Sequence, residues 1–455
     1  MATISSLGVG SGLDLGGLLD QLETAERMKL DPITTQKKTQ QTKLSAYGRL
    51  KSSLTSLQAA AKTLKDSKTF QGVTSSISGT GVAAAAKSDA VVGRYEVKVN
   101  TLAQAQSLAG AGVTDRTADL GAGTLTITQG STTLTVDLTA AASSLEDVRD
   151  AINKQGGGVS ASIVNDGTAA PHRLVLTSTA TGTDAQMTVS STGALSGLLG
   201  YDSATQSGVM TQTVAAANAT LEVNGIPITS QSNVVEGAVQ GVTLSLNEKG
   251  ATHVLTVERD NAAIKSAVSG FVTAYNALQS TISSLTSYNA DTQVAGDLLG
   301  DATLRSAQGQ LRNVLAGTLG EGTLTRLADI GIELELKGTL KLDSDKLDSL
   351  VSGNLSALSG FFTGSSTAGG MAGQLGTVLD GILKDGGALS NVTKGVESRV
   401  KSLDERYTRV EESISATVER YRKQFTQLDM MLSEMNATTS YLTQQFDALN
   451  AQLKG

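Results

Sequence analysis

The chain has 455 residues, a formal net charge of −7, and neither cysteine nor tryptophan. This length exceeds one ordinary hydrophobic core, so we expect several domains. The lack of cysteine excludes disulfides and thiolate metal sites. The acidic balance, without a basic patch carrying interleaved aromatic residues, argues against a nucleic-acid partner. No apolar run is long enough to span a bilayer, and no basic segment precedes an apolar one at the start, so we expect neither membrane insertion nor a cleaved secretory signal.

The first part of the chain predicts two helices behind a glycine- and serine-rich start, residues 1–13. Asp14 is a candidate N-cap for a helix to about Leu30. Asp31 is a candidate N-cap, with Pro32 at the first helical position, for a second helix to about Asp66. The second helix carries an apolar seam at helical spacing: Tyr47, Leu50, Leu54, Leu57, Ala61 and Leu64. Upstream, the same face is polar, which leaves that stretch weakly driven to fold alone: Gln36, Gln40 and Lys43.

From about Phe70 the apolar residues alternate with polar ones, which predicts strands. We expect strands near 95–99, 124–128, 133–138, 159–164, 173–178, 186–190, 220–228, 242–247 and 253–258. Ser143 and Glu146 form a candidate capping box for a helix near 145–154. Asn224-Gly225 is a hairpin signal. These strands predict two β blocks, of which the first includes the helix.

Helical spacing returns in the last part of the chain. One seam contains Ile264, Val268, Phe271, Tyr275, Leu278, Ile282 and Leu285. Shorter helices are expected near 301–315, 345–352 and 374–384, followed by a long helix from about Val392. The long helix carries a heptad seam at Leu403, Tyr407, Val410, Ile414, Val418, Tyr421, Phe425, Leu428, Leu432, Met435, Thr439, Leu442, Phe446, Leu449 and Leu453. The two successive steps of four through Val410, Ile414 and Val418 are a stutter, which locally unwinds a supercoil.

The seams indicate how the chain is organised. We expect an α+β multidomain protein in which terminal helices form a coiled-coil stalk and a helical leg, with two β-rich domains inserted as a head. The expected ranges are 1–45 with 410–455 for the coiled coil, 46–70 with 262–409 for the leg, 71–105 with 210–261 for the inner β domain, and 106–209 for the outer α+β domain. The leg core is expected to join Leu50, Leu54 and Leu57 to Phe271, Tyr275 and Leu278 and to the helix from Leu403 to Ile414.

The C-terminal seam is the strongest candidate functional feature. An apolar stripe is usually intramolecular core, but the N-terminal seam is too short to cover this one, which favours packing between copies of the chain. The stripe comprises Leu428, Leu432, Met435, Leu442, Phe446 and Leu449. We expect residues 1–45 and the stretch beyond Phe425 to be largely disordered in a free subunit and ordered on assembly.

Three other patterns favour structural roles over chemistry. Gly8, Gly10 and Gly12 lack the preceding strand and following lysine of a phosphate loop, which favours a flexible terminus. The aspartates of the run from Asp343 to Asp348 lack the glycine and glutamate of a calcium loop and favour a helix N-terminus. His172 and His253 have no nucleophile motif and favour surface or sheet positions. We therefore expect no enzyme active site, metal or cofactor.

Several segments closely resemble the flagellar hook-associated protein 2 family, the filament cap (FliD) family. The matching segments are Ile4-Ser-Ser-Leu-Gly-Val-Gly-Ser-Gly-Leu-Asp, Gly93-Arg-Tyr-Glu-Val-Lys-Val with Leu102-Ala-Gln-Ala, Phe271-Val-Thr-Ala-Tyr-Asn-Ala-Leu, Leu327-Ala-Asp-Ile-Gly-Ile, Gly338-Thr-Leu-Lys-Leu-Asp and Phe425-Thr-Gln-Leu-Asp-Met-Met-Leu-Ser-Glu-Met-Asn-Ala-Thr. The block at 124–190 looks like the insertion module shared with flagellins and hook proteins. The resemblance covers essentially the whole chain.

The resemblance implies a secreted protein at the distal tip of the bacterial flagellar filament. It implies type III export and assembly into a pentameric ring. It also implies that this ring promotes the folding and insertion of flagellin. The implied partners are further copies of the chain, flagellin, the hook–filament junction proteins and a cytoplasmic export chaperone that binds the C-terminal helix. An alternative from another class is a surface adhesin that binds host glycans or mucin through its β head.

Overall fold

The computed structural model describes residues 7–318, 322–364 and 369–453. Ile4 to Ser6 of the opening motif lie outside the described residues, as does the side chain of Leu453. The chain divides into two compact units, one formed by residues 1–67 and 264–455 and the other by residues 68–263. The two ends of the chain therefore share one helical unit, and the β-rich unit is inserted between them. This arrangement confirms the predicted α+β fold class.

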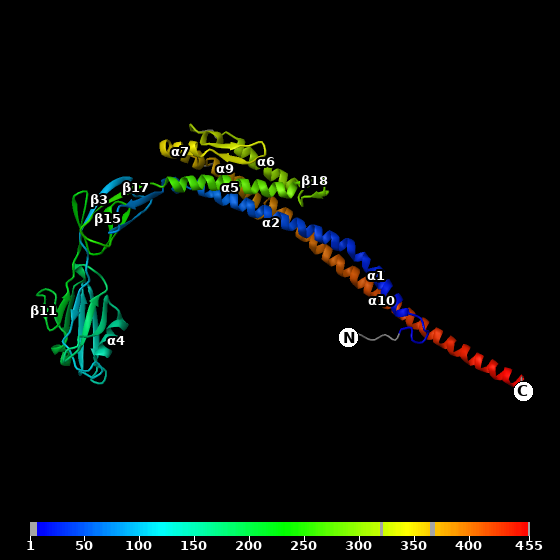
Figure 1. Cartoon of the computed structure of the whole chain (residues 1–455), viewed down its shortest axis with the longest axis horizontal. Coiled ribbons are helices and arrows are strands. Elements are labelled where there is room, and N and C mark those ends of the chain that lie inside the picture. Colours follow the sequence, from blue (N-terminus) through cyan, green and yellow to red (C-terminus); the bar gives the residue numbers. More distant parts are fainter. Residues whose placement is uncertain (1–6, 319–321, 365–368, 454–455) are drawn as a thin grey trace. The chain divides into compact units, whose positions relative to one another are not determined.

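The terminal unit is built mainly of helices that lie along one another (Figure 1). Its helices are α1 (Leu15–Arg27), η1 (Met28–Leu30), α2 (Asp31–Lys65), α5 (Asn261–Thr286), α6 (Ala302–Ala316), η4 (Leu327–Ile330), α7 (Ser344–Gly353), α8 (Leu355–Thr363), α9 (Met371–Leu383) and α10 (Ala388–Leu453). The described part of this unit also contains two short hairpins: β18 (Tyr288–Asn289) with β19 (Val294–Ala295), and β20 (Ile332–Leu334) with β21 (Leu340–Leu342). Within the described part of the chain, no helix is both long and apolar enough to cross a bilayer.

The N-terminal helices begin and join differently from one another. The side chain of Asp14 accepts a hydrogen bond from the Gly17 amide at 2.8 Å, so Asp14 is the predicted N-cap of α1. The prediction that Asp31 caps α2 is wrong, because Asp31 has helical φ and ψ of −58° and −44° and lies inside the helix. The turn η1 joins α1 to α2 almost without interruption, so its carbonyls already satisfy the amides that a cap would serve.

The leg is the part of the terminal unit where α2, α5 and α9 pack together. All six predicted leg-core residues are buried: Leu50, Leu54, Leu57, Phe271, Tyr275 and Leu278. The hydroxyls of Ser53 on α2 and Thr281 on α5 lie 2.9 Å apart, which places these helices side by side. The side-chain amide of Asn276 exchanges two hydrogen bonds with the backbone of Leu340, at 2.8 and 2.7 Å, and so fixes the β20–β21 hairpin on α5.

The predicted contact between the α2 seam and residues Leu403 to Ile414 of α10 is wrong in register. Lys37 forms an ion pair with Asp404, and Leu30 clusters with Ile414. Leu54 lies 17 residues beyond Lys37, which is about 25 Å further along α2. There Gln58 donates a hydrogen bond to Asp380 of α9. The polar upstream half of α2 therefore faces this part of α10, and the leucine seam faces α9 and α5.

The inserted unit contains two separately packed β cores. One core lies between a sheet of order β1-β17-β3-β13-β14 and a sheet of order β15-β16-β2. These strands are β1 (Val73–Ile77), β2 (Val82–Ala86), β3 (Gly93–Thr101), β13 (Ala219–Val223), β14 (Ile226–Ser230), β15 (Val234–Val239), β16 (Val242–Leu246) and β17 (Thr252–Arg259), and helix α3 (Lys68–Gln71) precedes them. The predicted Asn224-Gly225 turn joins β13 to β14, with both residues at positive φ.

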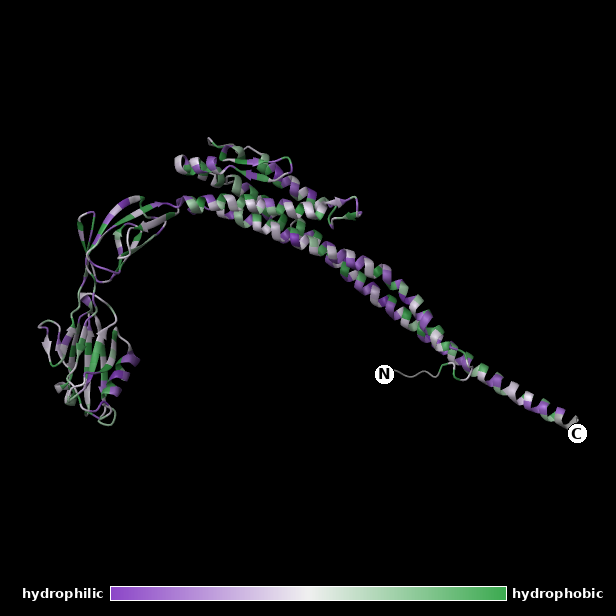
Figure 2. Ribbon diagram, in the orientation of Figure 1, coloured by the Kyte–Doolittle hydropathy of each residue, from purple (hydrophilic) through white to green (hydrophobic). Residues whose placement is uncertain are grey.

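The second core packs α4 with two antiparallel sheets of order β11-β10-β9-β5-β6 and β12-β4-β8-β7. Its elements are β4 (Ser107–Ala109), β5 (Gly123–Gln129), β6 (Thr132–Leu138), α4 (Leu145–Gln155), β7 (Val159–Asn165), β8 (His172–Ser178), η2 (Thr183–Ala185), β9 (Met187–Ser191), η3 (Gly193–Gly197), β10 (Tyr201–Asp202), β11 (Ser207–Gly208) and β12 (Thr211–Val214). Figure 2 shows apolar residues recurring along these strands, as expected when one face of each sheet is buried.

Two details of this second core differ from the sequence prediction. The capping box of α4 is formed by Ser144 and Asp147 instead of Ser143 and Glu146, one residue further along the chain. Ser143 is also buried, and its hydroxyl instead accepts a hydrogen bond from the Gly121 amide. Strand β12 pairs with β4, so strand pairing extends the second core beyond residue 209, the predicted limit, to Val214.

Candidate assembly surface

Helix α10 spans 66 residues, which corresponds to roughly 100 Å. It contains neither glycine nor proline from Val396 to Leu453, so nothing in its sequence breaks it. The helix changes its surroundings along its length. Its first turns bury Leu389 and Val396 within the terminal unit, its middle packs against α1, and its last part is exposed.

The middle of α10 and helix α1 form a two-helix stalk. Leu19 and Leu30 cluster with Ile414 and Val418, which are 5% and 8% exposed. The partly buried apolar residues packed against this cluster are Leu7, Tyr407, Val410, Tyr421 and Phe425. The stutter residues therefore form the buried seam, and each step of four keeps the next side chain on the face that meets α1.

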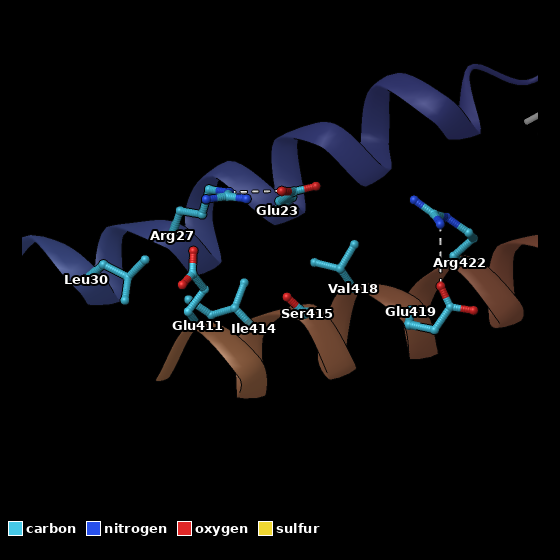
Figure 3. Close-up of a pocket in the computed structure, with 9 residues that line it drawn as sticks. All are labelled: Glu23, Arg27, Leu30, Glu411, Ile414, Ser415, Val418, Glu419 and Arg422. Carbon is cyan, nitrogen blue, oxygen red and sulfur yellow. Dashed lines mark hydrogen bonds and ion pairs between the residues drawn. The ribbon is translucent and has the colours of Figure 1, made fainter. Parts of the chain in front are cut away.

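A pocket of about 270 Å³ lies between α1 and α10 beside this cluster (Figure 3). Its apolar floor is Leu30, Ile414 and Val418, and charged side chains of both signs stand around it. Arg27 pairs with Glu23 at 2.9 Å on α1, and Arg422 pairs with Glu419 at 3.4 Å on α10. Glu23, and then the carboxylate of Glu411 across the pocket, raise the pKa of the Arg27 guanidinium. Both ion pairs are exposed and each lies within one helix, so they contribute little stability.

Beyond this cluster the predicted stripe is open to solvent. Leu428 is 39% exposed, Met435 56%, Leu442 48%, Phe446 62% and Leu449 56%, while Leu432 is partly buried. Met431, which sequence reasoning missed, adjoins the stripe and is 68% exposed. Figure 2 shows polar and apolar residues alternating along this end of α10. An amphipathic helix with an uncovered apolar stripe is suited to packing against another helix.

The remaining candidate sites have structural roles. Asp343 is the N-cap of α7, and its carboxylate accepts hydrogen bonds from the amides of Asp345 and Lys346 at 3.1 Å. His172 and His253 both lie in strands, and Nδ1 of His253 is 2.6 Å from the carbonyl oxygen of Ser78. Among the residues that the structure describes, no group of three or more histidine, cysteine, aspartate or glutamate side chains is placed to hold a metal ion.

Sequence reasoning missed one polar contact between the two ends of the chain. Gly8, Gly10 and Gly12 form a turn beside α10, where the amide and hydroxyl of Ser11 donate to the carboxylate of Asp429. The glycine-rich stretch itself could have predicted this contact, since closely spaced free backbone amides bind anions. The anion is a carboxylate of the same chain, 418 residues away.

The fold and the open seam define a helical-stalk protein with an inserted β-rich head. Three family models match the chain: flagellar hook-associated protein 2 N-terminus over residues 11–106, flagellar hook-associated protein 2 C-terminus over 216–437, and the flagellin hook IN motif over 124–180. The third lies within the second β core. The chain belongs to the flagellar hook-associated protein 2 family.

Members of this family are similar to the chain over nearly its full length. The flagellar hook-associated protein 2 of Escherichia coli (strain K12) is 40% identical over 463 residues, covering 98% of this chain and 99% of the relative. That of Salmonella typhimurium is 38% identical, covering 99% and 100%. The crystal structure of the D1-D2-D3 domains of the flagellar cap protein FliD from Escherichia coli is similar with a TM-score of 0.68 at 37% identity, covering 77% of this chain and 99% of that one.

Proposed function

We propose that this chain is a flagellar filament cap, an oligomeric structural protein at the distal tip of the filament. In this role it promotes the folding and insertion of exported flagellin and prevents the loss of subunits. The single observation that carries the proposal is the open stripe from Leu428 to Leu449 on the terminal helix of a chain in this family. The stripe supplies the surface on which copies associate.

The energetics of the stripe support self-association. Each fully buried large apolar side chain contributes roughly 1.5–3 kcal/mol. Several such residues on one helix can therefore offset the entropy lost when copies come together. We infer a pentameric ring, with the C-terminal helices converging through this stripe. Before export, the same stripe is the surface that a cytoplasmic chaperone would cover.

The two β cores and the leg suggest that different domains have different roles. We propose four domains: the terminal coiled coil, the leg, an inner β domain and an outer α+β domain whose limit follows β12. The head forms the lid over the growing end, and the legs meet flagellin and the hook–filament junction proteins. No bond is made or broken in this mechanism, which depends on positioning alone.

The proposal is tested in a strain that lacks this chain. We expect electron microscopy to show bare filament tips, short filaments and flagellin monomers in the medium. Complementation with the wild-type chain should restore capped filaments, whereas the double variant Leu442→Ser and Phe446→Ser should not. The matched control is Gln444→Ser with Ala448→Ser, because these exposed residues face away from the stripe on the same helix. Full-length filaments without the chain, or full complementation by the stripe variant, would overturn the proposal.

A further inference from the structure

The N-terminal loop from Gly8 to Ser11, here called the clasp, grips one carboxylate of α10. The amide of Ser11 donates to Oδ1 of Asp429 at 2.8 Å, and its hydroxyl donates to the same oxygen at 2.5 Å. The amide of Gly10 faces Oδ2 at 3.4 Å. The hydroxyl of Ser11, and then the amides of Ser11, Gly8 and Gly10, hold the pKa of Asp429 below its usual value. The carboxylate is thus bound in its charged form.

The glycines of the clasp are required by its geometry. Gly8 has φ of +93°, and a Cβ there would lie 2.0 Å from the carbonyl oxygen of Leu13. A Cβ on Gly10 would lie 3.0 Å from Cβ of Ser433, so the loop lies directly against the face of α10. The amide of Gly12 donates to the carbonyl of Gly8 at 2.9 Å and closes the turn. Larger residues would displace the loop from the helix.

The clasp lies where the covered part of α10 ends. Leu7, just before it, packs against the cluster that holds Ile414 and Val418. The exposed apolar residues of α10 begin beside the clasp with Leu428 and Met431 and continue beyond Ser433 from Met435. Helix α1 itself buries only Leu15 and Leu19, which makes it a weakly anchored cover for α10. The contacts of the clasp therefore add an anchor at the free end of α1.

We propose that the clasp fastens the N-terminus to Asp429 and thereby keeps a second copy off the seam around Ile414 and Val418, so that copies meet only on the open stripe from Leu428 to Leu449. This inference rests on the proposed self-assembly through the stripe. When the clasp opens, α1 loses its distal anchor, and the seam around Ile414 and Val418 becomes available to other copies. The clasp thus sets where intrachain packing stops and packing between copies begins.

The first test measures the clasp in the dilute monomer, independently of assembly. Because the chain has no cysteine, spin labels can be placed on Val9→Cys and Met430→Cys, two exposed positions. Double electron–electron resonance on this doubly labelled chain should give a narrow distribution centred on a short distance between the two labels. Adding Asp429→Ala should broaden and lengthen it, whereas the control Asp447→Ala, on the exposed end of the same helix, should leave it unchanged. An unchanged distribution in the Asp429→Ala background would overturn the clasp.

The second test measures which part of α10 meets another copy. Single-cysteine chains Val418→Cys and Leu442→Cys are oxidised after assembly, and disulfide-linked dimers are counted. We expect efficient cross-linking only at position 442, and a several-fold rise at position 418 when Asp429→Ala is added. Equal yields at both positions in the otherwise unchanged chain would overturn the limiting role of the clasp. A lack of cross-linking at 442 would overturn the proposed self-assembly, while the spin-label result would still decide whether the clasp exists.

Discussion

Tyr47 on α2 donates its phenolic hydrogen to the carboxylate of Asp301 across 2.5 Å. The other oxygen of this carboxylate accepts from the amide of Leu304 at 2.9 Å and caps α6. Tyr47 is 3% exposed, so its hydroxyl has this partner in place of water. One aspartate thus starts α6 and ties it to α2, although 254 residues separate it from Tyr47.

Tyr47→Phe is expected to destabilise the terminal unit. Hydrogen bonds to charged groups contribute roughly 1.5–3 kcal/mol, and partial exposure of Asp301 favours the lower end of that range. Thermal denaturation should show a lower midpoint for Tyr47→Phe, whereas Tyr441→Phe, at an exposed position on α10, should leave the midpoint unchanged. Equal midpoints for Tyr47→Phe and the wild-type chain would contradict this role.

The same contact predicts a loss of stability in alkali. Burial, and then the hydrogen bond to Asp301, raise the pKa of Tyr47 above its ordinary value of 10.0. The folded state keeps the phenol protonated while the unfolded chain ionises, so the contribution is complete below about pH 10 and is lost as pH rises further. Denaturant titrations across this window should show a smaller decline for Tyr47→Phe than for the wild-type chain.

Leu54→Ala tests the leg core. Leu54 is 1% exposed, and a truncation at such a site costs roughly 2–5 kcal/mol because it leaves a cavity. The matched change Leu442→Ala removes the same atoms from a residue that is 48% exposed in the single chain. We expect a lower denaturation midpoint for Leu54→Ala only, measured on monomers at low concentration. A lower midpoint of similar size for Leu442→Ala would contradict this assignment of core and surface.

The sequence was sufficient for features that depend on local periodicity. Each of the six predicted leg-core residues is buried, because three- and four-residue spacing defines one face of a helix wherever that helix packs. The sequence did not predict which helix covers that face. Leu54 lies beside α9 and not beside Leu403 to Ile414, since register between distant helices depends on loop lengths and on pairs such as Lys37 with Asp404.

Polar contacts were predicted least well, because one short sequence motif can often be formed by either of two neighbouring residue pairs. Two adjacent serines each precede an acidic residue at capping-box spacing, and only the structure selects Ser144 with Asp147. The pairing of Ser11 with Asp429 had no local signal on α10 at all. From the sequence alone, an isolated aspartate on a long helix is expected to be solvated, and only the structure shows the loop that binds it.

The limits of the outer head domain give a further prediction. Fragment 106–214 should fold alone, because it contains all the strands of the second core, while 106–209 lacks β12 and the buried core residue Met210. Removing Met210 should cost roughly 2–5 kcal/mol, as for other large core truncations. Amide spectra should be dispersed for 106–214, and its melting midpoint should exceed that of 106–209. Equal midpoints would place the boundary at 209 after all.

The last prediction concerns the free end of α10 before assembly. An isolated helix gains too little burial to offset the cost of nucleation and backbone ordering, whereas residues 414–433 have α1 and the clasp as partners. Because of these contacts we now expect order in the free subunit for residues 7–45 and 426–433, and we keep the expectation of disorder for the stretch beyond Ser433. Hydrogen exchange on the monomer should be fast across 435–449 and slower across α1 and 414–425.

Assembly should reverse that difference. Met435, Leu442, Phe446 and Leu449 gain apolar neighbours when copies converge, so their amides should become protected at concentrations that favour the oligomer. The variant Leu442→Ser with Phe446→Ser should stay fast-exchanging at every concentration, with the head unaffected, whereas Gln444→Ser with Ala448→Ser should behave as the wild-type chain. Strong protection of 435–449 at a concentration too low for oligomers would show that this helix is stable alone, and folding would then not be coupled to assembly.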